Sequence, residues 1–133
     1  MSEENVEIVR RAFAGFAEHG IEGVLPFNRH DVVTYSMPGW PDDSEYHGRD
    51  GLRKLARQWT ENFDDFGFEV RELRDAGDSV VALLVMAGTI KGSEDLVGHH
   101  IGSVSSGFRD GMIGEARYFA SWQAALEAAG LSE

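Results

Sequence analysis

The chain has 133 residues, 42% hydrophobic and 26% charged, a size and balance typical of one folded globular domain. Its 23 acidic and 12 basic residues give a formal charge of −11, so nucleic-acid phosphates and anionic membranes should repel it. There is no cysteine, which excludes disulfides and thiolate metal sites and is typical of a cytoplasmic protein. We therefore expect a single domain over residues 1–133, without a signal peptide, a membrane span or a nucleic-acid partner.

The N-terminal segment predicts an amphipathic helix. Ser2 is a suitable N-cap, and apolar residues follow it at spacings of three and four: Val6, Val9, Phe13 and Phe16. The helix should end at Gly20, and residues 21–25 can add a short second helix before Pro26.

A strand and a second strong helix should follow. Residues 31–37 are rich in β-branched and aromatic side chains and predict a strand, whereas residues 40–47 have no apolar period and predict a loop. After Gly48 an apolar helix face reappears, formed by Leu52, Leu55, Ala56, Trp59 and Phe63.

Beyond this helix the hydrophobic period changes from 3.6 to 2, which indicates a sheet. Four strands are predicted, over residues 66–74, 80–91, 97–109 and 112–119, and turn residues between them favour sequential antiparallel hairpins. Ser121 should cap a final helix that ends at Gly130. The order predicts an α+β fold with a cone-shaped, strongly curved, mostly antiparallel sheet and about three to four helices packed on its concave face.

Three local motifs make the chain similar to a known superfamily. They are YHGRDG at residues 46–51, DAGDSVV at 75–81, and FRDG at 108–111 followed by AALEAAGL at 124–131. With the order of elements, they resemble the nuclear transport factor 2-like superfamily, in its SnoaL-like polyketide cyclase and ketosteroid isomerase-like branches. The resemblance implies a cone around an apolar pocket, and it leaves the reaction open because members differ in chemistry.

The ketosteroid isomerase-like enzymes use residues that this chain does not match. Their general-base aspartate follows the first strand, where this sequence reads YSMP at residues 35–38. Their oxyanion tyrosine lies on the first helix, where this chain offers Phe13 and Phe16, which cannot donate a hydrogen bond. Steroid-type isomerisation by those residues is therefore not expected.

Two adjacent histidines are the most informative polar residues. Neighbouring side chains of a strand point to opposite faces, so either His99 or His100 should point inward. His100 shares parity with Val104 and Phe108, which favours His100 as the inward residue and as a proton carrier. The alternative is an ordinary core histidine whose hydrogen bond is made with a backbone carbonyl or a neighbouring side chain.

The last strand offers a second set of candidate catalytic residues. Glu115 and Arg117 share a face with Ile113, while Tyr118 lies on the other face. Either Arg117 or Tyr118 should line the interior and orient a substrate oxygen. Glu115 and Arg117 also resemble part of the carboxylate–arginine–carboxylate relay of epoxide hydrolases. The alternative is an ordinary ion pair on the outer surface of the sheet.

Large side chains are candidates for the pocket wall. They are Phe16, Tyr35, Trp40, Trp59 and Met86, and the alternative for each is an ordinary place in the core. The densest potential ligands for a hard cation are Asp42, Asp43, Glu45 and His47, but their spacing is not that of a calcium loop. We expect no metal and no cofactor.

Two functions follow from these patterns. The first is a cofactor-free acid–base enzyme, of isomerase, cyclase or hydrolase type, acting on a small apolar metabolite. The second is a noncatalytic ligand-binding or dimerisation module, because Ser103 and Ser105 make one strand face polar. Superfamily relatives often dimerise through the open sheet face, so the resemblance implies a homodimer under either function.

Overall fold

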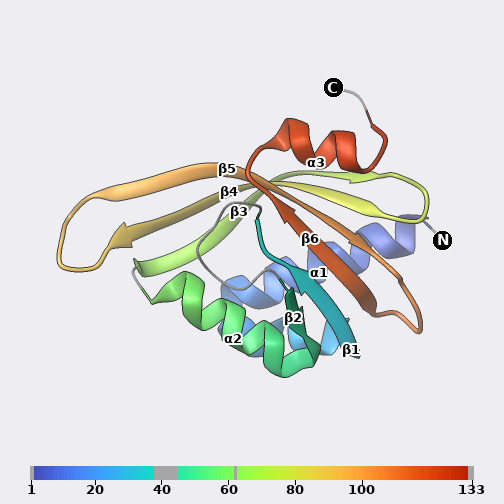
Figure 1. Ribbon diagram of the computed structural model, residues 1–133, viewed down its shortest axis with the longest axis horizontal. Coiled ribbons are helices and arrows are strands. Elements are labelled where there is room, and N and C mark those ends of the chain that lie inside the picture. Colours follow the sequence, from blue (N-terminus) through green and yellow to red (C-terminus); the bar gives the residue numbers. More distant parts are fainter. Residues whose placement is uncertain (1, 38–44, 62, 132–133) are drawn as a thin grey trace.

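The computed structural model describes residues 2–37, 45–61 and 63–131. Its elements, in chain order, are α1 (Ser2–His19), η1 (Gly20–Gly23), η2 (Leu25–Phe27), β1 (Asn28–Tyr35), β2 (Glu45–His47), α2 (Gly48–Thr60), β3 (Phe63–Asp75), β4 (Val80–Ile90), β5 (Leu96–Ser106), β6 (Ile113–Phe119) and α3 (Trp122–Ala128). Figure 1 shows their arrangement. Within the described residues, no helix is long and apolar enough to cross a membrane.

Two local predictions need correction. The C-terminal end of the predicted loop, Glu45–His47, is a short strand that pairs antiparallel with β1. The predicted short helix at residues 21–25 is instead two 3-10 helices, because Pro26 at the start of η2 has no backbone N–H to continue a helix.

The strands form one curved sheet in the order β2-β1-β6-β5-β4-β3. The chain-consecutive pairs from β3 to β6 are antiparallel, as the hairpin turns predicted, whereas β1 pairs with β6 in parallel. The edge strands β2 and β3 do not pair with each other, so the expected strongly curved α+β sheet is confirmed but does not close.

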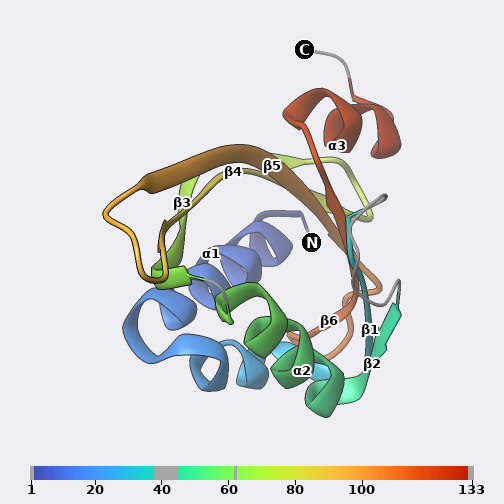
Figure 2. The same ribbon diagram turned by 60° about the vertical axis from the view of Figure 1, so that its left-hand side comes forward.

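The helices cover both faces of this sheet. α1 and α2 lie in its concavity, and α3 packs on the convex face (Figure 2). This differs from the expectation that all helices share the concave face. Gly102 permits the docking of α3, because a Cβ at this position would lie 2.4 Å from the Cβ of Ala125. The predicted homodimer through the open part of the convex face stays a prediction.

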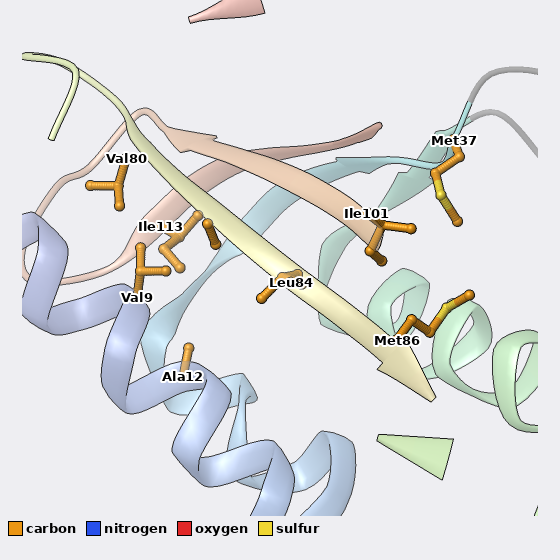
Figure 3. Close-up of a cluster of buried hydrophobic side chains, with 9 residues drawn as sticks. Val9, Ala12, Met37, Val80, Leu84, Met86, Ile101 and Ile113 are labelled. Carbon is orange, nitrogen blue, oxygen red and sulfur yellow. The ribbon is translucent and has the colours of Figure 1, made fainter. Parts of the chain in front are cut away.

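The sheet consequently has a hydrophobic core on each face. The concave core joins α1 to β4, β5 and β6 through Val9, Leu84, Ile101 and Ile113 (Figure 3). The convex core joins α3 to β4 and β5 and is formed by Val81, Leu83, Val104, Ala125 and Leu126. The first half of β4 is buried on both faces, which explains its uninterrupted apolar sequence.

Candidate functional site

A buried cavity lies between α1, α2 and the concave face of the sheet. The apolar stripe of each helix supplies part of its wall, with Val9, Ala12, Phe13 and Phe16 from α1 and Leu52, Leu55, Ala56 and Trp59 from α2. The sheet closes the other side with Phe68, Ser105, Ala116 and Tyr118. The helical period of the sequence therefore places the two helix walls, and strand alternation places the third.

Five of the lining residues are aromatic and pack against one another. The rings of Trp59 and Tyr118 meet edge to face with centroids 4.8 Å apart, and the ring of Phe68 lies 5.4 Å from that of Phe16 and 5.6 Å from that of Trp59. Phe13 contacts Phe68 at 5.8 Å, also edge to face. Such interlocked rings hold the wall in a defined shape.

The cavity is small. Its volume is about 60 Å³, whereas an engineered apolar cavity that binds benzene has about 150 Å³. A ligand larger than a few heavy atoms must therefore move part of the wall or extend beyond it.

Polar groups in and beside the cavity are few, and most have no partner. The amide nitrogen of Asn28 donates to the carbonyl oxygen of Val24 at 3.0 Å. The indole N–H of Trp59 is buried without a hydrogen-bond partner, as is the hydroxyl of Ser103, which lies directly opposite Tyr118 in the β5–β6 ladder. Tyr118 is only half-buried, and its hydroxyl forms no hydrogen bond with any of the described residues. Unsatisfied buried donors are costly, which points to an acceptor that enters from outside.

Tyr118 is suited to donate a hydrogen bond. Burial raises the pKa of its phenol to about 12, so the phenol stays neutral in the physiological range. None of the described residues that line the cavity is an aspartate, glutamate, histidine, lysine or arginine. The cavity can therefore bind an oxygen acceptor and polarise it, while its described lining residues include no base that could take up a proton near neutral pH.

Three of the predicted site residues meet at this cavity: Phe16, Trp59 and Tyr118. The choice between Arg117 and Tyr118 is decided in favour of Tyr118. Ile113 also faces the concave core, although the alternation placed it on the other face from Tyr118. The β1–β6 pairing is irregular at this point, because β1 advances by five residues, from Asn28 to Val33, while β6 advances by two, from Ile113 to Glu115.

The predicted inward orientation of His100 is wrong. His100 is exposed on the convex face, where its ring stacks on that of Trp122 with centroids 4.5 Å apart. His100 does share a face with Val104, but Val104 packs in the convex core beneath α3, so this face is not the concave one. Phe108 packs against the concave core because it lies beyond the end of β5 at Ser106 and beyond Gly107, whose φ is 65°.

Arg117 and Tyr35 also lie outside the cavity, which corrects their predicted roles. The Arg117 guanidinium lies 4.1 Å from the Tyr35 ring centroid, and its Nε forms an ion pair with Glu115 at 3.1 Å. The ion pair is half exposed, as the alternative interpretation of these residues held, and it offers no relay to the cavity.

The remaining predicted residues fall elsewhere. Met86 is buried in the concave core but does not line the cavity. Trp40, Asp42 and Asp43 lie outside the described residues. Glu45 and His47 form an exposed pair 3.5 Å apart. No described group of three or more His, Asp or Glu is arranged to hold a metal ion.

Asn28 and Ser105 are the site residues that sequence reasoning missed. The sequence contained a signal for Ser105, because it shares parity with the apolar Ile101 on β5. Asn28 had no such signal, since it lies at the start of β1, three residues before the predicted strand.

A family model for the SnoaL-like domain matches residues 9–116, which include both helix walls and most of the sheet. The chain belongs to the SnoaL-like domain family. No curated protein matches it.

Solved structures share this SnoaL-like fold at low sequence identity. A nuclear transport factor 2-like protein from Burkholderia thailandensis is 21% identical with a TM-score of 0.77, covering 96% of this chain and 98% of that one. The protein TerC, co-crystallised with polyporic acid, is 19% identical with the same TM-score and coverage. A protein with a ketosteroid isomerase-like fold from Catenulispora acidiphila, in complex with trimethylamine, is 17% identical with a TM-score of 0.73, covering 95% and 94%. At these identities the likeness shows the fold alone.

Proposed function

We propose that this SnoaL-like protein binds a small, largely apolar molecule with a hydrogen-bond acceptor, in the cavity beside Tyr118. The observation that carries the proposal is that Trp59 and Tyr118, whose rings are in contact at an apolar cavity, each have a donor without a partner among the described residues, namely the indole N–H and the phenol hydroxyl. A ligand oxygen between them would satisfy both, while the aromatic wall excludes water.

Binding is favoured over acid–base catalysis because of where the titratable groups lie. His100 and Arg117, the candidate proton carrier and orienting cation, face away from the cavity. A neutral phenol can polarise a carbonyl group, but a proton transfer would also need a base. The small molecules held by TerC and by the Catenulispora protein support a small-molecule role for this chain as well.

The test is a thermal-shift screen of neutral cyclic ketones, each paired with its hydrocarbon counterpart, such as acetophenone with ethylbenzene. We expect a ketone to raise the melting temperature more than its hydrocarbon partner, because only the ketone accepts hydrogen bonds. The variant Ala116→Val, which adds two methyl groups to the cavity wall, should abolish the shift. Ala128→Val, exposed on α3, is the control and should retain it. No shift for any ketone with the wild type would contradict the proposal.

A further inference from the structure

The cavity adjoins an open groove between the end of α1, η1 and α2. Phe16, Ile21 and Ala56 line both the cavity and the groove, so these three side chains stand between the buried space and solvent. Gly15 and Gly23 fix this junction, because a Cβ at Gly15 would lie 2.1 Å from the carbonyl oxygen of Gly23. We call this groove, which shares three lining residues with the cavity, the cavity entrance.

Basic residues gather at this entrance. Arg53 and Arg57 line the groove, and Arg57 also lines a second groove that continues along α2 with Lys54 and Lys91. Lys54 and Lys91 are the only lysines of the chain. Figure 1 shows how the C-terminal end of α2 approaches the β4–β5 turn that carries Lys91. Arg53 and Arg57 thus border the entrance together with Glu22, and the second groove adds Lys54 and Lys91 beside Glu61, in a protein whose formal charge is −11.

Two of these cations have no carboxylate partner. Arg53 already forms ion pairs, since its guanidinium contacts the carboxylates of Glu22 and Asp50, each at 2.8 Å. The hydrogen bond from Arg53 lowers the pKa of Glu22, which confirms that this carboxylate is engaged. Arg57 and Lys91 are exposed and form no ion pair with any residue in the part of the chain that the structure describes.

The cavity is too small for a ring-sized ligand, so part of such a ligand would extend toward these cations. The enclosed space of about 60 Å³ is less than half that of the engineered apolar cavity that binds benzene. A ring-sized molecule held beside Tyr118 must displace Phe16 or extend past it, and its outer end then lies in the groove next to Arg57.

From this arrangement we infer that the ligand carries a carboxylate at the end opposite its acceptor oxygen, and that Arg57 binds this carboxylate at the cavity entrance. The inference rests on the proposed function and names its ligand class. The planar guanidinium of arginine can donate two parallel hydrogen bonds to a carboxylate. Lys91 adds a second positive charge, which raises the local concentration of anions against the negative field of the remaining surface.

Calorimetry with two matched probes tests the inference. The probes are para-acetylphenylacetate and para-acetylphenylacetamide, which have similar shapes and the same ketone but differ in charge. We expect the acid to bind the wild type about fivefold more tightly than the amide at low salt. Added salt should remove this preference, because the entrance is exposed to solvent.

Variants of the entrance residues test whether the preference for the acid over the amide arises there. Arg57→Gln should bring the affinity for the acid down to that for the amide, and Lys91→Gln should reduce it by a smaller factor. Arg109→Gln is the matched control, because Arg109 is also exposed and forms no ion pair among the described residues, and it does not line the cavity or either groove. Unchanged melting temperatures of the ligand-free variants would establish that each variant is folded.

The outcomes separate the two proposals. Equal binding of acid and amide, or equal losses in Arg57→Gln and Arg109→Gln, would overturn the carboxylate assignment and leave the ketone-binding cavity intact. Tighter binding of the cation para-acetylbenzylamine than of the acid would overturn it as well. If neither the probes nor any ketone of the thermal-shift screen binds, the proposed function itself fails.

Discussion

Replacing the Tyr118 hydroxyl should weaken ligand binding without weakening the fold. The Tyr118 side chain is half-buried, and its hydroxyl has no hydrogen-bond partner among the described residues, so the protein bears part of the cost of a desolvated donor. Such a group typically costs about 1–3 kcal/mol. Tyr118→Phe removes only this oxygen and preserves the edge-to-face contact with Trp59.

We therefore expect Tyr118→Phe to keep the free energy of unfolding or raise it by up to about 1 kcal/mol, or about 3–4 °C in melting temperature. Its affinity for a ketone should fall by roughly three- to tenfold, the value of one neutral hydrogen bond. Affinity for the matching hydrocarbon should not change, because a hydrocarbon cannot accept the bond.

Urea denaturation and calorimetry measure the two effects on the same samples. Tyr46→Phe is the control for loss of a tyrosine hydroxyl that has a partner, since Tyr46 is buried and donates its hydroxyl proton to Oε1 of Gln58. That variant should lose about 1 kcal/mol of stability. If Tyr118→Phe loses as much as Tyr46→Phe, or retains full affinity for the ketone, the description of Tyr118 as an unsatisfied donor is wrong.

Three further predictions concern pH, the convex face and the histidine pair. Between pH 10 and 12 the wild type should lose roughly 2–3 kcal/mol of stability that Tyr118→Phe keeps, because the phenol of the unfolded chain releases its proton near pH 10 and that of the folded chain only near pH 12. Urea titrations at a series of pH values measure this difference. Equal losses of stability in the wild type and in Tyr118→Phe would contradict the prediction. Gly102→Ala should destabilise the protein by about 1–3 kcal/mol, because its Cβ would overlap the Cβ of Ala125. Gly98→Ala should have little effect in thermal denaturation, because a Cβ at Gly98 would meet no atom nearer than 3.9 Å. His100→Ala should leave calorimetric ketone affinity unchanged, and a loss of tenfold or more would return this residue to the site.

Much of the fold and half of the cavity wall could be predicted from the sequence. The apolar stripes of α1 and α2 follow from the 3.6-residue period of a helix, so the sequence alone predicts that Phe16 and Trp59 point to the interior, where both line the cavity. The hairpin turns likewise determined the antiparallel order from β3 to β6, because each turn joins neighbouring strands through local backbone geometry.

The assignment of strand faces required the tertiary structure. Alternation correctly placed His99 and His100 on opposite faces, but it could not say which face is the concave one. That choice depends on α3, which covers the convex side and packs against Val104, the residue that shares its face with His100. The sequence by itself determined the local elements, whereas the pairing of distant segments decided that Tyr118, and not His100, faces the cavity.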